Sequence, residues 1–219
     1  RKMTLAFSAK RRGVTRKDFP RSEPCWDASA FKPYLGATLL GPIDGEVKAL
    51  AMKITAGQKT VLAKAKAIYD WTCSNMYRDP NTRGCGTGDV CALLKKPGGK
   101  CTDISSVYIA LCRAAGVPAR EVFGLRLGKK AEEDITGYQH CWAEFYLPGY
   151  GWVPADPAEN RRAIGNGEVQ LRLLRHARIL PGGLVPSFSP QHGLFGMRAR
   201  VGLERREKLI ARCDRAEVQ

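Results

Sequence analysis

Residues 98–120 read GGKCTDISSVYIALCRAAGVPAR, and this stretch predicts one long helix that begins at a cysteine. Its apolar positions repeat at the 3.6-residue period of a helix: Ile104, Val107, Tyr108, Leu111 and Ala115. Gly116 and Pro118 then form a stop signal, because glycine tolerates the left-handed conformation after a helix and proline cannot continue one. We therefore expect a helix from Cys101 to Ala115.

The position of Cys101 at the start of this helix suggests a reactive thiol. Peptide dipoles give a helix N-terminus partial positive charge, and its unpaired N–H groups point toward an anion. A thiol in that place is shifted toward thiolate, with a pKa of roughly 3.5–7.5 when a cationic histidine also helps. The same N–H groups, including that of Cys101, can donate to the oxyanion of a tetrahedral intermediate, and one such donor contributes about 3 kcal/mol.

A predicted β-hairpin downstream carries the two groups that a nucleophilic thiol needs. Residues 139–147 and 152–155 are rich in aromatic and apolar residues, and PGYG at 148–151 forms a turn between them. His140 opens the first strand and supplies an imidazole that titrates in the useful range. Asp156 ends the second strand, where a carboxylate would orient that imidazole.

The hairpin register decides whether these two side chains can meet. Side chains alternate along a strand, so His140 and Asp156 share a face if Trp142 or His140 lies opposite Asp156. A strict two-residue turn at Gly149 and Tyr150 would place them on opposite faces. We therefore predict an odd-numbered loop or a bulge between the strands.

Each of the three residues also has a purely structural interpretation. A cysteine in a regular element is more often a small buried hydrophobe, which suits Cys73, Cys112 and Cys141. His140 alone could be a structural histidine, and Asp156 could simply start a turn. The structural interpretations are less convincing when the three residues are considered together. All three candidate positions fall at the ends of elements, where catalytic groups are often found.

Four blocks of sequence then follow in a fixed order: GKCTD (99–103), ALCRAAGVPAR (110–120), HCWAEF (140–145) and GWVPAD (151–156). Together they resemble the transglutaminase-like superfamily of papain-type thiol enzymes, most closely its bacterial members, over about residues 60–157. The resemblance implies an α+β, papain-like and transglutaminase-like core, with the cysteine-bearing helix packed on an antiparallel sheet. It implies Cys101 as nucleophile, His140 as base and Asp156 as orienting acid.

The activity that this resemblance implies is thiol-dependent acyl transfer on an amide or peptide bond through an acyl-thioester. Water as acceptor would make the protein a peptidase or amidase, and an amine acceptor would make it a transglutaminase. No counterpart of the sandwich domain or calcium sites of animal cross-linking enzymes is found, which favours hydrolysis. An inactive or basic binding module of the same fold is the further alternative. The sequence assigns no side chain to the oxyanion hole, although Trp71 and residues 75–77 resemble the family's helix and loop before the cysteine.

The net charge of the chain indicates which classes of partner to expect. The chain of 219 residues has 36 Lys and Arg against 21 Asp and Glu, a formal net charge of +15. This balance favours acidic partners such as an anionic envelope polymer, but no nucleic-acid motif is present, so specific nucleic-acid binding is not predicted. We expect a protein or peptide substrate. The sequence contains no run of 18 apolar residues, so it predicts no transmembrane segment. Exported, periplasmic and cytoplasmic locations all stay open.

Neither a cofactor nor a metal is expected. The eight cysteines include no CxxC pair, which gives little support to a zinc site. The glycines before Lys100 lack the order of a phosphate-binding loop, so nucleotide binding is not expected. Cys85 and Cys91 lie in a glycine-rich loop and could bridge each other or Cys73 in an oxidising compartment.

The expected organisation has three parts: an irregular N-terminal segment (1–40), a transglutaminase-like catalytic domain (41–160) and an Arg-rich C-terminal segment of uncertain structure (161–219). Inside the domain we expect, in order, a helix from Asp44, a helix after Thr60, a loop over 78–100, a strand over 120–127 and a charged loop over 129–137. Weak helical patterns at 169–180 and 203–213 complete the expected elements.

Overall fold

A computed structural model describes residues 4–8, 19–20, 22–126, 130, 132–159 and 198–202 of the chain. They fall into two compact units. The larger unit holds the described residues between 13 and 124 and between 140 and 159, and the smaller unit holds the rest. These divisions differ from the boundaries expected at residues 41 and 160. Among the described helices none has both the length and the apolar character that crossing a bilayer requires.

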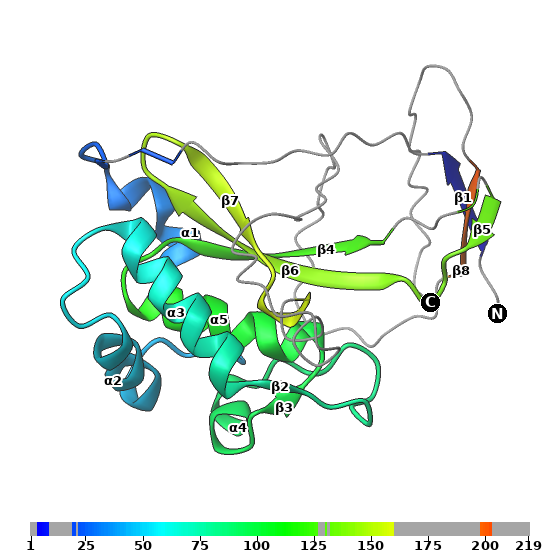
Figure 1. Cartoon of the computed structure of the whole chain (residues 1–219), viewed down its shortest axis with the longest axis horizontal. Coiled ribbons are helices and arrows are strands. Elements are labelled where there is room, and N and C mark those ends of the chain that lie inside the picture. The colour runs from blue at the N-terminus through cyan, green and yellow to red at the C-terminus, as the bar shows by residue number, and fades with distance from the viewer. Residues whose placement is uncertain are drawn as a thin grey trace, which may run out of the picture. The chain divides into compact units, whose positions relative to one another are not determined.

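The larger unit combines helices with a three-stranded sheet (Figure 1). Its helices are η1 (Ala28–Phe31), α1 (Lys32–Leu35), α2 (Gly45–Ile54), α3 (Val61–Asn75), α4 (Val90–Lys95) and α5 (Cys101–Ala114). Its main sheet has the strand order β4-β6-β7, formed by β4 (Ala119–Leu125), β6 (Gln139–Leu147) and β7 (Gly151–Ala155). A second, two-stranded sheet pairs β2 (Tyr77–Arg78) with β3 (Gly98–Gly99) in parallel.

Helix α5 confirms the expectation drawn from the 98–120 stretch. It begins at Cys101 and ends one residue earlier than expected, at Ala114. Gly116 has a φ of 79°, and the N–H groups of Gly116 and Val117 donate to the carbonyls of Arg113 and Cys112. This is the Schellman arrangement that satisfies the last carbonyls of a helix. The Nζ atoms of Lys48 and Lys64 also donate to carbonyls at this C-terminus, where positive charge is favourable.

The two helices before α5 also form where their patterns predict. Asp44 precedes α2, although its side chain makes no capping hydrogen bond. Thr60 caps α3, because its Oγ1 accepts a hydrogen bond from the N–H of Ala63 at 3.1 Å. Both helices pack on α5, which becomes the central helix of the unit.

One face of the main sheet forms the core with α5 and α3, which lie beneath the sheet in Figure 1. In β6 every second side chain is buried in this core: Cys141, Ala143, Phe145 and Leu147. From α5 the core receives several fully buried side chains, among them Ile104, Val107, Tyr108 and Leu111. Burying one such side chain contributes about 1.5–3 kcal/mol, so the α5–sheet contact is a main source of stability.

The opposite face of the sheet is covered by aromatic residues from the N-terminal segment. The ring of Phe31 lies 4.1 Å from that of Tyr146, and Tyr34 lies 4.8 Å from Trp152, centroid to centroid. The guanidinium of Arg120 stacks on Trp152 at 4.1 Å. These side chains therefore cover the β6–β7 hairpin on the face opposite α5.

The β6–β7 hairpin confirms the predicted odd-numbered loop. Leu147 pairs with Gly151, so the loop has three residues, 148–150. Gly149 adopts a φ of 76° and Gly151 a φ of 101°, conformations that favour glycine. Ala143 pairs with Ala155, and one step further the register brings Asp156 level with Trp142. Asp156 and His140 therefore share a face of the hairpin.

The expected loop over 78–100 is wrong in part. It contains α4, capped by Asp89, whose Oδ1 accepts from the N–H of Ala92 at 3.1 Å. It also contains β3, whose pairing with β2 is extended by a hydrogen bond from the N–H of Asp79 to the carbonyl of Gly99 at 2.9 Å. These elements have two to six residues each, which is too short to show a repeating pattern.

The expected irregular segment 1–40 also contains regular structure, namely β1 (Thr4–Ser8), η1 and α1. Within this segment the carboxylate of Glu23 accepts hydrogen bonds from the N–H groups of Val61 and Leu62, at 2.7 and 2.8 Å. These donors are unpaired groups at the N-terminus of α3. The segment is thus tied to the larger unit by a contact across 38 residues of sequence.

The smaller unit contains a three-stranded sheet of order β1-β8-β5, formed by β1, β8 (Arg198–Gly202) and β5 (Glu132–Asp134). β8 runs parallel to β1 and antiparallel to β5. The expected charged loop over 129–137 is therefore wrong where β5 lies. The weak helical patterns at 169–180 and 203–213, and all of the Arg-rich segment except 198–202, lie outside the described residues.

Candidate active site

Cys101 lies at the first position of α5 and is 7% exposed. The backbone around it is held by Asp103, a buried carboxylate two residues later. Its Oδ2 accepts from the N–H of Lys100 at 3.0 Å, and its Oδ1 accepts from Thr87 and Gly88, both at 2.9 Å. A Cβ atom at Gly99 would overlap the Asp103 side chain, so glycine is required for this close approach.

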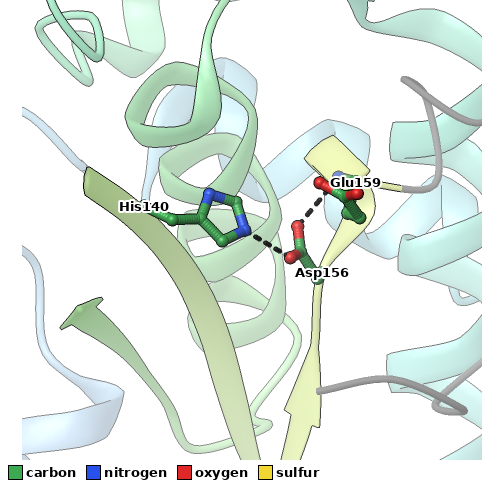
Figure 2. Close-up of side chains that lie close together, drawn as sticks. All are labelled: His140, Asp156 and Glu159. Carbon is green, nitrogen blue, oxygen red and sulfur yellow. Dashed lines mark hydrogen bonds and ion pairs between the residues drawn. The ribbon is translucent and has the colours of Figure 1, made fainter. Parts of the chain in front are cut away.

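His140 and Asp156 meet at the open end of the hairpin (Figure 2). The Nε2 atom of His140 lies 2.5 Å from Oδ2 of Asp156. His140 is 8% exposed, and the side chain of Asp156 is 17% exposed. A short contact with little solvent between the groups is strong, because water screens it poorly.

The carboxylate of Asp156 is fixed on its other side as well. Its Oδ1 accepts a hydrogen bond from the N–H of Glu159 at 2.9 Å, which Figure 2 also shows. The hydroxyl of Tyr69, on α3, donates to the backbone carbonyl of Asp156 at 3.2 Å. Both contacts restrain the residue after β7, so the carboxylate faces the imidazole.

Cys101 is surrounded by groups that hydrogen-bond to its sulfur. The side chain of Cys141 has the largest effect, followed by Cys85, and His140 and the backbone of Cys141 add to it; together they hold the pKa of Cys101 well below its usual value. Burial acts in the opposite direction. His140 therefore contacts Asp156 directly and is one of the groups that lower the pKa of Cys101.

Cys141 titrates in the opposite sense. Its hydrogen bond with Cys101, its burial and the nearby charge of Cys101 raise its pKa above the usual value. Its sulfur also lies 3.1 Å from Oγ1 of Thr102. We assign the negative charge of the pair to Cys101, because the helix terminus and the imidazole both face that sulfur.

Burial alone has the reverse effect on a thiol elsewhere in α5. Cys112 lies in the core, and its pKa rises to about 12 because of burial. The two cysteines of this helix therefore differ through their surroundings, since one has polar neighbours and the other lies in an apolar core.

Glu121, on β4, is a further titratable group beside the thiols. Burial and the nearby charge of Cys101 together raise its pKa to about 7, although Arg113 acts in the opposite direction. Its side chain also hydrogen-bonds to Cys141. The carboxyl therefore lies close enough to Cys101 for the two groups to influence each other's charge.

Three ligand atoms near the hairpin end lie close enough to hold a metal ion. They belong to His140, Asp156 and Glu159, and all lie within 4.8 Å of one another. This is the sole such group among the residues that the structure describes. Because Nε2 of His140 already contacts Asp156, a metal ion here would compete with the imidazole–carboxylate contact.

The sequence pointed to Cys101, His140 and Asp156; the structure places His140 against Asp156 and among the groups that lower the pKa of Cys101. The sequence did not indicate Cys85, Thr102 or Glu121 as neighbours of the Cys101 sulfur. It suggested that Cys141 is a buried core residue. Cys141 is buried, as expected, but it also hydrogen-bonds to Cys101. Its position directly after His140 is the signal that could have indicated this contact.

The chain belongs to the transglutaminase-like superfamily, because the sequence profile of that superfamily matches residues 48–157, half of the chain. The match begins in α2 and ends one residue after Asp156, so it includes α5 and the hairpin. The mixed helix-and-sheet architecture with a cysteine at the head of the central helix is the papain-type fold of this superfamily.

Two relatives are similar in sequence over this region. An uncharacterized protein of Haemophilus influenzae is 45% identical over 145 residues, which cover 58% of this chain and 39% of that protein. The uncharacterized protein YebA of Bacillus subtilis is 31% identical over 127 residues, which cover 52% of this chain and 17% of YebA. The chain thus spans well under half the length of either relative.

Two solved structures are similar in fold. A candidate cysteine protease from Cytophaga hutchinsonii has a TM-score of 0.48 and 25% identity, and the match covers 59% of this chain and 42% of that one. The periplasmic domain of TgpA from Pseudomonas aeruginosa has a TM-score of 0.49 and 23% identity, with 65% and 51% covered.

Proposed function

We propose that the protein is a cysteine-dependent acyl transferase that acts on amide or peptide bonds and passes the acyl group to water, as a peptidase or amidase. Two observations support this proposal: Nε2 of His140 lies 2.5 Å from Asp156, and His140 is one of the groups that lower the pKa of Cys101. A thiol with a lowered pKa, an imidazole and an orienting carboxylate together are the requirements for nucleophilic catalysis by cysteine.

In the first half-reaction, the thiolate of Cys101 attacks the carbonyl carbon of the scissile amide. The C–N bond then breaks, and protonated His140 gives its proton to the leaving amine. The acyl group stays on sulfur as a thioester. In the second half-reaction, His140 takes a proton from water as the water attacks the thioester. The C–S bond breaks, the acid is released, and the Cys101 thiolate and protonated His140 are restored.

We assign the oxyanion donor to the backbone N–H of Cys101. The N–H of the next residue, Thr102, already donates to the carbonyl of Cys85 at 3.0 Å, which leaves the first residue of α5 as the donor nearest the sulfur. One preorganised donor in such a position lowers the activation barrier by about 3 kcal/mol. Asp156 in this scheme stabilises the imidazolium and fixes its orientation.

Water is the proposed acceptor because it needs no binding site of its own, whereas a transamidation needs a site that holds the amine. A protein or peptide is the proposed substrate, since the thiol requires an acyl group with an amine leaving group. The basic surface implied by the net charge of +15 is compatible with acidic segments in such a substrate.

A peptide-hydrolysis screen run beside incorporation of a labelled amine tests the proposal. We expect hydrolysis by the wild type, retained in Cys91→Ser and reduced about a thousandfold or more in Cys101→Ser, because serine at this position lacks the acidity of the thiol. Cys91 is the matched control because it is an exposed cysteine on α4. Amine incorporation without hydrolysis would contradict the choice of acceptor, and equal rates in Cys101→Ser would contradict the nucleophile.

A further inference from the structure

Cys85 is a thiol that the proposed reaction does not use, yet it contacts the proposed nucleophile. Its backbone carbonyl accepts the N–H of Thr102 at 3.0 Å, which holds its loop against the first turn of α5. Its side chain is also one of the groups that lower the pKa of Cys101, 16 positions later in the sequence. The two sulfurs are therefore neighbours, and both are thiols in the structure.

Glycines set the path of the loop around Cys85. Gly84 and Gly86 flank it, with φ values of 60° and 101°, conformations that residues with a side chain rarely adopt. A disulfide requires a shorter sulfur–sulfur distance than a hydrogen bond and a specific dihedral angle. A Cys85–Cys101 disulfide would therefore require Cys85 to move closer to the start of α5.

Cys141 also contacts Cys101, but it is a poorer partner for a disulfide. It lies on the central strand β6, is 1% exposed and is held by Thr102. Cys85 is half-buried and lies in a loop. A resolving thiol must reach the first oxidation product, and Cys85, in a loop and more exposed than Cys141, is the better placed of the two.

We propose that Cys85 is the resolving thiol of Cys101, and that peroxide converts the pair into a reversible disulfide that switches the site off. The thiolate of Cys101 attacks one oxygen of hydrogen peroxide, the O–O bond breaks, and hydroxide leaves and takes a proton to become water. Cys101 is now a sulfenic acid. The sulfur of Cys85 attacks it, the S–S bond forms, and the S–O bond breaks as water leaves with the Cys85 proton.

The balance of this sequence is one peroxide reduced to two waters and two thiols oxidised to one disulfide. A dithiol reductant reverses it by thiol–disulfide exchange. Without a resolving thiol, the sulfenic acid would oxidise further to sulfinic acid, which ordinary thiols cannot reduce. The inference rests on the proposed function, because it names a modification of the same nucleophile.

Peroxide treatment of the full chain, followed by blocking of thiols with iodoacetamide and peptide mass mapping, tests this inference. We expect a cross-linked peptide pair containing Cys85 and Cys101, and a fall of about tenfold in Cys101 alkylation that dithiothreitol reverses. In Cys85→Ala the Cys101 peptide should gain two oxygen atoms, and dithiothreitol should not restore it. Cys91→Ala, six residues away on α4, is the matched control and should form the cross-link as the wild type does.

The outcomes separate this inference from the proposed function. Rapid alkylation of Cys101 before oxidation, followed by a Cys101–Cys141 cross-link or by oxygen addition in the wild type, would overturn the role of Cys85 while leaving the nucleophile intact. Slow alkylation of Cys101 before any oxidation would instead count against the proposed function. Both readouts are masses, so neither depends on knowing the substrate.

Discussion

At the sulfur of Cys101, hydrogen bonds and burial act in opposite directions. Donors from Cys141, Cys85 and His140 favour the anion, whereas burial favours the neutral thiol. The effect of the hydrogen bonds on the pKa is the larger one here, because several act on one atom at a helix N-terminus. At Cys112, within the same helix, burial wins and the pKa rises to about 12.

Asp156→Asn tests the support that the imidazole receives. Asparagine keeps the shape of the side chain but cannot stabilise an imidazolium by charge, so the thiolate–imidazolium pair should weaken. We expect alkylation of Cys101 by iodoacetamide at pH 6 to slow about tenfold, since one pKa unit of lost stabilisation is a factor of ten. Asp70→Asn, on the exposed side of α3, is the control and should alkylate at the wild-type rate. Equal rates in both variants would contradict the role of Asp156.

Glu121→Gln tests the buried carboxyl on β4 through the pH dependence of stability. Burial raises the pKa of Glu121 to about 7, from an ordinary value of 4.5, so between these pH values the folded state holds a proton that the unfolded state has lost. The free energy of unfolding should therefore fall as pH rises from 4.5 to 7, and stay lower above 7. The expected total decrease in the free energy of unfolding is about 3 kcal/mol, at about 1.36 kcal/mol per pKa unit.

The glutamine variant has no proton to lose, so its stability should change less across this window. We expect its advantage over the wild type in urea unfolding to grow by about 3 kcal/mol between pH 5 and pH 8. Glu46→Gln, at an exposed position of α2, reports the effect of the amide substitution itself. A difference between Glu121→Gln and wild type that stays constant with pH would show that the carboxyl is not perturbed.

Residue types and their neighbours predicted the three main site residues but not the surrounding ones. Cys101 was predictable because glycines and a helical repeat define its position, and His140 because it opens a strand. Cys85 and Glu121 approach the sulfur only through the packing of a loop and of β4 on α5, which no local pattern encodes. Their side chains lie in the site for tertiary reasons.

At the scale of elements, the start of α5 depends on the loop that precedes it. Asp103 links the two, because its carboxylate accepts from the N–H groups of Thr87, Gly88 and Lys100. The short β2–β3 pairing also fixes this region, since a Cβ atom at Gly98 would overlap the ring of Tyr77. The loop, the pairing and the helix start therefore form one structural unit around Cys101.

Asp103→Ala should destabilise the fold and disturb the site together. It leaves three backbone donors without the acceptor they have in the native structure, and each lost hydrogen bond to a charged group costs about 1.5–3 kcal/mol. We expect a loss of about 4 kcal/mol in urea unfolding. Asp27→Ala, an exposed aspartate that accepts from Ser29, is the control and should lose much less. A loss for Asp103→Ala no larger than the control would contradict this account.

The sequence predicted the helices whose apolar residues repeat at the helical period and the hairpin whose side chains alternate between two faces. The odd loop of the β6–β7 hairpin followed from the alternation of side chains, and the register of Leu147 with Gly151 confirms it. Helix α4 was missed because six residues do not complete two helical turns. Strand β5 was missed because its residues are charged and it pairs with β8 from the far end of the sequence.

At the scale of the whole molecule, the superfamily match and the site coincide in the larger unit. Residues 48–157 include both α5 and the hairpin, which meet at Cys101 and His140. The smaller unit joins Thr4–Ser8, residues 132–134 and residues 198–202 by strand pairing across most of the chain. Pairing over such separations could not be predicted from local pattern, and so the division of the chain into two units was not predicted either.

The most direct measurement is the rate at which iodoacetamide alkylates each cysteine as a function of pH, read by peptide mass spectrometry. Because the pKa of Cys101 is lowered, its thiolate persists as pH falls, so we expect it to react fastest and to keep its rate well below the ordinary thiol pKa of about 8.5. His140→Ala should move that profile to higher pH, whereas Cys112 should stay unreactive throughout. A Cys101 rate that rises near pH 8.5 together with the exposed Cys25 and Cys91 would contradict the thiolate on which the proposed chemistry depends.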